Sequence, residues 1–393
     1  MKASSNRPAD AYRALQQHLD RHPMGFPETS GNAAVKVLKH IFTPAQAELA
    51  TCLSHHARSV DEIFSRAGTL VSSKTELEQK LDEIVARGGI ESGGGPGKKW
   101  YRNAPLVVGM YEYQLGRLSP EFVKDFAEYT SAREFGISFL STQLPQMRTI
   151  PIGKSIRVDI PPQPFDTVSD LLKNSRGPFA ICECICRKKQ GMLGNACKAT
   201  DRTETCLAVG HLAQTAVTIK MGRAIDRDTA VSILEKNQAQ GLVLQPSNTR
   251  DIDFICSCCG CCCGMLRMQQ KLPKPVDFWA SNFQAQIDTA ACTGCGICAE
   301  KCQVDAVSKQ KKKKWYAVNR HQCIGCGLCV AACPAKAVVL EKTSEQTVPP
   351  KNRDTLLEII GSHKKGRMGK LLVTGKLVKD ALVTGRTEIL KSH

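Results

Sequence analysis

The sequence has no apolar run close to the ~20 residues that a membrane-spanning helix needs. Its start, MKASSNRPADAYRALQQH, also lacks the apolar core of a secretory signal. These two absences argue against a transmembrane or secreted protein, and we expect a cytoplasmic location. Hydrophobic residues make up 42% and charged residues 23% of the chain, which is ordinary for a folded protein, so disorder is expected only in short pieces.

Acidic residues are comparatively scarce. The 37 Asp and Glu residues stand against 54 Lys and Arg residues, which gives a formal net charge of +17. A positive surface favours acidic partners, whether nucleic acid, anionic lipid or an acidic protein, and the charge alone does not choose among them. Part of the excess is local, because lysines cluster near residue 312 and the segment after Lys351 is basic.

Cysteine, in contrast, is abundant, with 20 residues in the chain. Such a number indicates either a disulfide framework in a secreted protein or metal ligation in a reducing compartment, and the missing signal sequence favours metal. Cys52 stands alone, whereas the other cysteines form three groups between Cys182 and Cys333. This distribution agrees with metal binding in the second half of the chain.

The length suggests about two to four domains of roughly 150 residues each. We expect an α+β protein in which residues 1–31 form a flexible arm with a short helix, 32–150 a helical winged-helix-like domain and 165–271 a cysteine-rich α/β domain. Residues 285–342 form a further cysteine-containing module, and 343–393 a basic tail that serves as a docking appendage or surface arm. A proline-rich stretch separates the second part from the third.

The winged-helix-like interpretation rests on three short predicted helices followed by the Gly-rich stretch ESGGGPGKKWYRNAP. A winged helix usually suggests DNA binding. The candidate recognition helix KTELEQKLDEIVAR, however, carries more acidic than basic residues, and helices that enter a phosphate-lined groove are normally positive. Protein docking or homodimer formation is therefore the favoured role, while wing residues Lys98, Lys99, Tyr101 and Arg102 keep DNA binding open.

The module 285–342 contains an internal repeat. ACTGCGICAEKCQVDAVS and QCIGCGLCVAACPAKAVV align without a gap at an offset of 31 residues, matching Cys for Cys and Gly for Gly. Each copy carries a C-x2-C-x2-C-x3-C pattern, which wraps three thiolates around one face of a cubic cluster, and its glycines let the backbone bend and direct amides at the sulfurs. Four thiolates also suit zinc, but a duplicated, interlocked pattern favours clusters.

On these motifs the module resembles the bacterial two-cluster 4Fe–4S ferredoxins, in which the fourth cysteine of each run binds the other cluster. The resemblance implies two 4Fe–4S clusters with crossed ligand sets. Cluster 1 is held by Cys292, Cys295, Cys298 and Cys333, and cluster 2 by Cys323, Cys326, Cys329 and Cys302. One departure from the family is Gln303, where the family usually has proline.

Between the two repeats lies the lysine-rich stretch SKQKKKKWYAVNRH. Positive charge near a cluster favours the added electron, so it should raise the reduction potential somewhat, and it offers a dock for an acidic redox protein or oxidoreductase subunit. The candidate docking residues are Lys309, Lys311, Lys312, Lys313 and Lys314. A merely solvated turn is the alternative.

The cysteine-rich domain holds a further 11 thiols, which are Cys182, Cys184, Cys186, Cys197, Cys206, Cys256, Cys258, Cys259, Cys261, Cys262 and Cys263. If FAICECICR is a strand, its alternation places Cys182, Cys184 and Cys186 on one face. The stretch CLAVGHLAQTAVTIK is expected to be a helix. Nearby basic residues, including Arg187, could lower thiol pKa values.

The second group of these thiols, in FICSCCGCCCGML, is expected to end a strand, turn at Gly260 and Gly264, and enter a helix. Thiolates at such a turn gain from backbone amides and from the helix N-terminus. We expect the cysteine-rich domain to bind one or two further iron–sulfur clusters, with zinc or a redox-active dithiol as alternatives. Together with the ferredoxin-like module, this domain looks like a group of poorly characterised multi-cluster iron–sulfur proteins of anaerobes.

The favoured function is single-electron relay between a low-potential donor and a larger oxidoreductase, through the two ferredoxin-type clusters and further middle clusters. An enzyme with a catalytic cluster or thiol site between Cys182 and Cys263 is the second hypothesis. An iron–sulfur redox-sensing DNA-binding regulator is the third, because of the winged-helix-like region. The module itself contains no obvious nucleophile, acid or base, which favours relay over bond chemistry.

Overall fold

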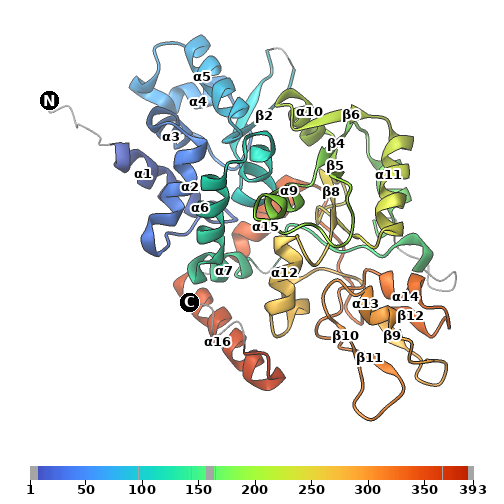
Figure 1. Ribbon diagram of the computed structural model, residues 1–393. Helices are drawn as coiled ribbons and strands as arrows, with labels where there is room; N and C mark the ends of the chain where they lie inside the picture. The colour runs from blue at the N-terminus through green and yellow to red at the C-terminus, as the bar shows by residue number, and fades with distance from the viewer. Residues whose placement is uncertain are drawn as a thin grey trace.

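The computed structural model describes residues 8–95, 97–142, 144–155, 163, 165–364 and 366–387. Helices and strands occur together in the chain, as expected for an α+β protein. Figure 1 shows the N-terminal helices at the upper left, the cysteine-rich region at the right and the duplicated region at the lower right, with the last helix at the lower left. Among the described residues, no helix combines the length and apolar character needed to cross a membrane.

The N-terminal region starts with the helices α1 (Pro8–Asp20), α2 (Ala33–Ile41), α3 (Pro44–Ala50), α4 (Val60–Ala67) and α5 (Lys74–Ala86). The strands β1 (Arg58–Ser59), β2 (Ile90–Gly93) and β3 (Trp100–Asn103) form an antiparallel sheet in the order β1-β3-β2. Thr43 and Ser59 begin α3 and α4 with capping boxes, and the Ser73 side chain caps α5. Helices α6 (Pro120–Ser131) and α7 (Arg133–Leu140) follow.

Residues 8–31 differ from the expected loose arm. Helix α1 carries Tyr12, Leu15 and Leu19 on one stripe, and all three are buried against α2 and α3. The Tyr12 hydroxyl donates a hydrogen bond to the Phe42 carbonyl at 3.0 Å. The segment is polar overall, but its short apolar stripe is enough to hold the helix against the core.

The cysteine-rich region is built on a sheet with the strand order β6-β4-β5-β8-β7. Its strands are β4 (Phe179–Glu183), β5 (Glu204–Val209), β6 (Gly222–Ile225), β7 (Val243–Pro246) and β8 (Phe254–Cys258). Its helices are α8 (Val168–Asn174), α9 (Ile185–Met192), α10 (His211–Thr218), α11 (Arg227–Ala239) and α12 (Gly264–Lys271). All the described strand pairs of this sheet are antiparallel, so the expected α/β layering is wrong here.

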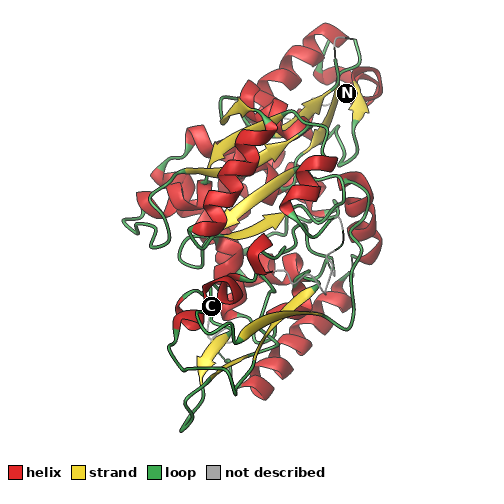
Figure 2. Cartoon of the chain, turned by 90° about the vertical axis from the view of Figure 1, so that its right-hand side faces the viewer, coloured by secondary structure: helices red, strands yellow, loops and turns green. Residues whose placement is uncertain are grey.

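The two faces of this sheet carry different side chains. On one face, Phe179, Leu207 and Ile255 pack with α8 and α11 around Leu171, Leu234 and their neighbours. Because side chains alternate along a strand, the cysteines at even positions of β4, β5 and β8 point to the opposite face. That face meets α10 and the N-terminal region. Figure 2 shows helices on either side of the strands.

The duplicated region folds as two short helices and two strand pairs. Strand β9 (Phe283–Ile287) pairs antiparallel with β12 (Val338–Lys342), and β10 (Val307–Lys309) with β11 (Tyr316–Val318). Helices α13 (Ile297–Glu300) and α14 (Leu328–Ala332) each begin inside one copy of the repeat. The two copies therefore face each other, since α13 and α14 are in contact and β9 and β12 close the region from its two ends.

The C-terminal segment differs from the expected surface arm. Helix α15 (Arg353–His363) buries Leu356, Leu357 and Ile360. Its Arg353 forms a 2.9 Å ion pair with the fully buried Glu91 of β2, and Arg102 of β3 pairs with the same carboxylate at 2.7 Å. Burial alone would raise the pKa of Glu91, but Arg353 and Arg102 lower it to about 2.

The last helix, α16 (Arg367–Thr384), packs beside α7. Leu377 of α16 forms a small buried cluster with Leu140 of α7 and Leu272 after α12. Lys376 and Lys274 both pair with Asp380, which is buried. The basic tail is therefore folded onto the rest of the chain through both of its helices.

Candidate metal centres

The cysteine loops of the two repeats depend on glycine for close backbone approach. Gly294 and Gly325 both adopt a positive φ, near 75° and 66°. A side chain at Gly294 would collide with the Lys314 carbonyl, and one at Gly325 with the Phe283 carbonyl. The glycines therefore let the first loop approach the turn that carries Lys314 and the second loop approach strand β9 closely.

The structure brings cysteines of the two repeat copies close to one another. Burial raises the pKa of Cys298, and negative charge on the neighbouring thiols of Cys292 and Cys333 raises this pKa further. Similarly, burial raises the pKa of Cys326 to about 12, with Cys302 and Cys323 as its neighbours. The thiol that ends each copy thus lies with the thiols of the other copy.

Backbone amides point at the repeat sulfurs. The Ala285 amide donates to the Cys323 sulfur at 3.3 Å, and the Ala306 amide donates to the Cys302 sulfur at 3.2 Å. Amides around a cluster stabilise negative charge on its sulfurs and help to set the reduction potential. The donor set of thiols and amides therefore fits 4Fe–4S clusters.

In the cysteine-rich region, six thiols form a closed ring in which each side chain interacts with two others of the set. We call this set the sulfur ring. In order around the ring, its members are Cys184, Cys186, Cys263, Cys258, Cys256 and Cys206. Cysteines that lie far apart in the chain therefore meet in one place.

Strand register and helix starts bring the sulfur ring together. Leu207 of β5 pairs with Ile255 of β8, and the next step in that register sets Cys206 against Cys256. Cys258 follows two residues later on the same face of β8. Cys184 and Cys263 are the N-cap residues of α9 and α12, so their thiols lie at helix N-termini that favour negative charge.

The sequence prediction that one strand presents Cys182, Cys184 and Cys186 on a single face is wrong. Strand β4 ends at Glu183 with a register shift after Cys182, and the chain enters α9 at Ile185. Cys184 and Cys186 therefore meet as the cap and first turn of a helix, not as one face of a strand. Similarly, the stretch predicted as one helix begins with strand β5, which carries Cys206. The prediction of a strand, a turn and a helix around Gly260 is confirmed.

Arg187 supplies positive charge to the ring. Its guanidinium is buried and donates to the Ser257 carbonyl at 2.7 Å and to the Thr205 hydroxyl. The thiols of Cys186 and Cys206 lower the pKa of Cys184, and Arg187 lowers it further. The expectation that basic residues near the first group affect thiol ionisation thus agrees with the position of Arg187.

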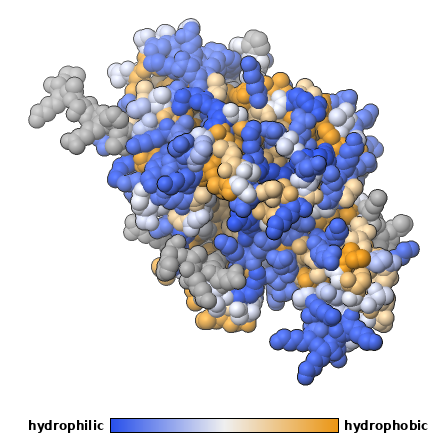
Figure 3. Space-filling view, in the orientation of Figure 1, coloured by the Kyte–Doolittle hydropathy of each residue, from blue (hydrophilic) through white to orange (hydrophobic). Residues whose placement is uncertain are grey.

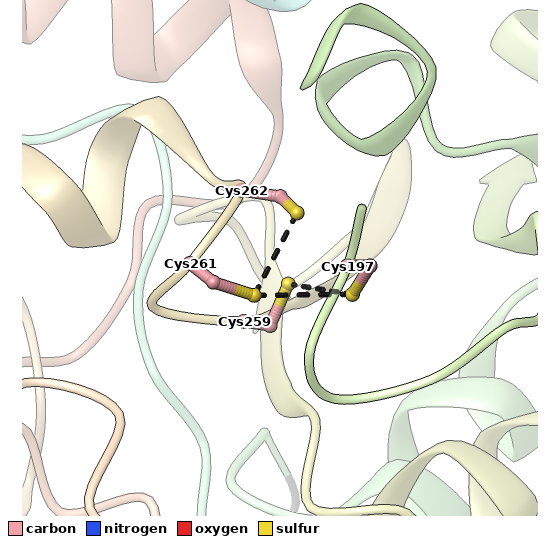
Figure 4. Close-up of side chains that lie close together, drawn as sticks. All are labelled: Cys197, Cys259, Cys261 and Cys262. Atoms are coloured by element: carbon pink, nitrogen blue, oxygen red, sulfur yellow. Dashed lines mark hydrogen bonds between the residues drawn. The ribbon is translucent and has the colours of Figure 1, made fainter. Parts of the chain in front are cut away.

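A second set of four thiols is much more compact. We call Cys197, Cys259, Cys261 and Cys262 the compact tetrad, and all four sulfurs lie within 4.8 Å of one another. Figure 4 shows Cys197 approaching from one loop and the other three from the turn after β8. The sulfur of Cys197 lies 3.6 Å from that of Cys259 and 3.9 Å from that of Cys261. Such a set can hold a metal ion.

Two cysteines lie outside these sets. Cys182 is buried on β4, where it pairs with Gly222 of β6, and burial raises its pKa to about 12. Cys52 lies in the N-terminal region, where its thiol donates to the Arg66 carbonyl. Neither is a member of the ring or the tetrad.

The sulfur ring opens onto a cavity of about 940 Å³. Side chains of α6, α7, α9, α12 and α16 line it, and most of them are apolar. Cys186, Cys206 and Cys256 keep part of their surface exposed on its wall. Sequence reasoning did not find this cavity, because its walls come from segments up to 270 residues apart, from Val107 to Val378.

Two polar side chains that the sequence did not single out line the same cavity. Tyr111 stacks on Phe126 with ring centroids 3.9 Å apart, and its buried hydroxyl has no hydrogen-bond partner among the described residues. Burial raises the pKa of the Glu112 carboxyl to about 8, although it accepts a 2.9 Å hydrogen bond from the Gly109 amide. Both residues follow Val108, whose φ of 51° is unusual for a β-branched residue. The strained backbone places polar groups beside the sulfurs.

The duplicated region is joined to the cysteine-rich region at Gln303. Its side-chain oxygen accepts a 2.7 Å hydrogen bond from the Gly260 amide, and its carbonyl accepts one from Gln270 at 3.1 Å. Gly260 lies between two tetrad cysteines, and Gln303 directly follows Cys302. The residue that departs from the ferredoxin pattern is therefore the one that makes this contact.

The lysine-rich stretch forms the exposed turn between β10 and β11. All five of its candidate docking lysines are exposed. Figure 3 shows strongly hydrophilic side chains protruding at the lower right, where Figure 1 places β10 and β11. The Lys314 carbonyl borders Gly294, which lies between Cys292 and Cys295. The turn thus lies next to the first cysteine loop.

Comparison with known proteins identifies one part of the chain. Residues 285–340 match the family model described as a 4Fe-4S dicluster domain. Neither a curated protein nor a solved structure matches the chain. The matched segment coincides with the duplicated region and contains all eight of its cysteines. Residues 285–340 therefore form a 4Fe–4S ferredoxin-type domain.

Proposed function

We propose that this protein is an iron–sulfur electron-transfer protein in which the ferredoxin domain exchanges single electrons with a metal centre in the cysteine-rich region. The dicluster match and the crossed grouping of the thiols support two 4Fe–4S clusters. Cys292, Cys295, Cys298 and Cys333 would hold one cluster, and Cys302, Cys323, Cys326 and Cys329 the other. When bound, such clusters accept and release one electron at a time.

The observation that carries this proposal is the hydrogen bond between the Gly260 amide and the Gln303 side chain. It fixes a ligand loop of the ferredoxin domain against a turn that carries thiols of the cysteine-rich region. A side chain at Gly260 would collide with the Gln303 carbonyl, so glycine is needed for this close approach. An electron carrier requires short, fixed separations between its centres, and this contact provides one.

The sulfur ring is the proposed site of a further iron–sulfur cluster. Its thiols are buried or face the cavity, two of them lie at helix N-termini, and Arg187 offsets part of their negative charge. These are the conditions under which several thiolates can be held together in a folded protein. A 4Fe–4S cluster has four irons, and the ring has more thiols than that. Not every ring sulfur therefore needs to bind iron directly.

The N-terminal region is proposed to be a winged helix that docks protein. The order of its helices and its β1-β3-β2 sheet support this fold. Three of the four residues that had kept DNA binding open are engaged within the chain, because Lys99 pairs with Glu78 and Asp82 of α5 and Tyr101 is fully buried. Arg102 pairs with Glu91 and Asp354. A regulator that reads DNA with this surface is therefore disfavoured.

The exposed lysine turn is the proposed dock for an acidic redox partner, such as a subunit of a larger oxidoreductase. Its position next to the Cys292 loop would bring that partner close to the first cluster. A cytoplasmic location and an anaerobic metabolism are the setting that fits oxygen-sensitive clusters in a reducing compartment.

The proposal is tested by purifying the full chain without oxygen and counting iron and acid-labile sulfide. At least about eight irons and eight sulfides per chain are expected from the ferredoxin domain. Stepwise reduction followed by EPR should show two interacting centres and at least one more. A colourless protein that contains zinc and no iron would contradict the proposal.

A second candidate function is reductive catalysis beside the sulfur ring. The observation that favours it is the cavity, in which partly open ring thiols, the unpartnered Tyr111 hydroxyl and the Glu112 carboxyl meet. A hydroxyl and a carboxyl at such a place could donate protons to a small bound molecule while electrons arrive from the ferredoxin domain.

Catalysis and simple relay differ in whether iron in the ring is open to an external ligand. If it is, adding cyanide to the reduced protein should change the EPR signal of the middle centre and leave the ferredoxin signals unchanged. The same addition to a Tyr111→Phe variant should give the same change, because the hydroxyl is proposed to act on substrate and not on iron. An unchanged middle signal in both proteins would leave relay as the function.

A further inference from the structure

The compact tetrad has the dimensions of a site for one metal ion. A zinc ion about 2.3 Å from four tetrahedrally arranged sulfurs separates each pair of sulfurs by about 3.8 Å. The corresponding separations are 3.6 Å between Cys197 and Cys259, 3.9 Å between Cys197 and Cys261, and 3.6 Å between Cys261 and Cys262. All the other pairs lie within 4.8 Å, so the four sulfurs are close enough together to bind a single ion.

The same dimensions do not suit a cubic iron–sulfur cluster. In a cubane each thiolate binds a different iron atom, so its sulfurs must stand further apart than the sulfurs around one ion. The tetrad thiols also come from a different kind of segment, with Cys261 and Cys262 adjacent in the chain, whereas the ferredoxin loops separate their first three ligands by two residues. Adjacent cysteines in a tight turn can share one ion.

The tetrad is largely buried, as structural metal sites are. Cys259 and Cys262 are buried together with Leu242, and Cys197 and Cys261 are partly buried. The amides of Ala199 and Thr200 donate to the Cys197 sulfur, which helps to hold it as a thiolate. The described residues of the tetrad offer four protein ligands, the number that fills a tetrahedral zinc site without an open position.

We propose that the compact tetrad binds one zinc ion, which fastens the loop after α9 to the turn after β8. That turn also supplies Cys258 and Cys263 to the sulfur ring and Gly260 to the contact with Gln303. The zinc ion thus has a structural role, as it orders the turn on which both the ring and the ferredoxin contact depend. The cysteine-rich region then holds one cluster site and one zinc site.

Zinc is assigned over mononuclear iron because of ligand chemistry. Thiolates are soft ligands that select zinc among the available divalent metals, and Zn²⁺ binds a given site more tightly than Fe²⁺. Zinc is also redox-inert, which suits an ion that holds a turn between two electron-carrying sites.

The experiment measures zinc and iron in the full chain purified without oxygen and without added metal. We expect about one zinc per chain, together with the iron of the clusters. Cys197→Ser should reduce zinc to less than about a tenth of that value and leave the ferredoxin irons in place. The matched control is Cys182→Ser, a buried thiol of the same region outside the tetrad, which should keep its zinc.

Zinc X-ray absorption on the unmodified protein covers the case in which Cys197→Ser does not fold. Four sulfurs at about 2.3 Å with no iron neighbour are expected. A wild-type chain without zinc would overturn the assignment, whether Cys197→Ser then loses about one iron, indicating mononuclear iron, or about four, indicating a cluster. The ferredoxin irons are counted in the same samples, so failure of the zinc site and failure of the proposed electron-transfer function remain distinguishable.

Discussion

The ferredoxin domain and the cysteine-rich region both gather thiols, but they do so in different ways. In the ferredoxin domain, each proposed ligand set takes three thiols from one short loop and one from the other copy of the repeat. In the cysteine-rich region, the sulfur ring draws its thiols from α9, β5, β8 and α12. Ring members that follow one another in the sequence lie up to 50 residues apart, as Cys206 and Cys256 do. Local loops therefore define the first kind of site, and the tertiary fold defines the second.

The largest expected effect tests the crossed ligand sets of the ferredoxin domain. The double variant Cys292→Ala/Cys302→Ala removes a ligand from each set and should lose about eight irons per chain. Cys323→Ala/Cys302→Ala removes two ligands from one set and should lose only about four. Iron and sulfide counting checks both. Equal losses from the two double variants would contradict the crossed arrangement and the local character of these sites.

The next effect concerns the sulfur ring. Cys256→Ala should remove the middle iron, about four atoms per chain, while the ferredoxin signals persist in EPR. Cys182→Ala serves as the control, because Cys182 is buried on β4 of the same sheet and lies outside the ring. If both variants keep the same iron content as the wild type, the ring does not bind iron.

The packing of α15 on the N-terminal region can be weakened without replacing a cysteine. Glu91→Gln leaves Arg102 and Arg353 without their buried partner, which should cost about 3–5 kcal/mol in the free energy of unfolding. The exposed pair of Lys36 and Glu128 provides the control, and Glu128→Gln should cost less than about 1 kcal/mol. Chemical denaturation of the full chain, followed by far-UV circular dichroism, measures both. Similar costs would show that the buried cluster is not a structural tie.

A smaller effect is expected at the contact between the two regions. Gln303→Ala removes the acceptor for the Gly260 amide, a hydrogen bond with a net contribution of about 1 kcal/mol. Hydrogen exchange in the 259–262 turn should therefore become about fivefold faster. Gln310→Ala in the lysine turn should leave that exchange unchanged. If the two variants give the same exchange rates, Gln303 does not hold the turn.

The smallest effect should come from the exposed lysines. Replacing all five docking lysines with glutamine is expected to slow reduction by the dianion dithionite by less than about tenfold, because surface charge steers anions towards the cluster. Reduction by a cationic viologen should not slow. Salt at about 0.5 M should remove the difference, since it screens exposed charges. A difference that persists in salt would point to a structural change instead.

Sequence reasoning succeeded where ligands and spacing are local. The cysteine repeats predicted the ferredoxin domain, which the family match confirms. The turn at Gly260 between β8 and α12 was also predicted correctly. It failed at Cys184, because cysteine is not a usual N-cap residue and the alternation of apolar residues suggested that the strand continued. The start of α9 could be recognised only in the fold.

Long-range pairing explains the other differences. Cys197 and Cys259 are 62 residues apart, and nothing in the chain near either one indicates the other. Gln303 was visible as a departure from the ferredoxin pattern, but its partner Gly260 was not. The pairing of Arg353 with Glu91 likewise connects segments that lie far apart in the chain, so the basic composition of the tail alone suggested an exposed arm.

The ion pairs between α15 and the β2–β3 hairpin also have a consequence during synthesis. Chains emerge from the ribosome N-terminus first, so Glu91 and Arg102 are made well before Arg353, their partner in the ion-pair cluster. Helix α16, which forms one wall of the cavity beside the sulfur ring, is made later still. The wall of the cavity beside the sulfur ring is therefore complete only after α16 has been made and has packed in place.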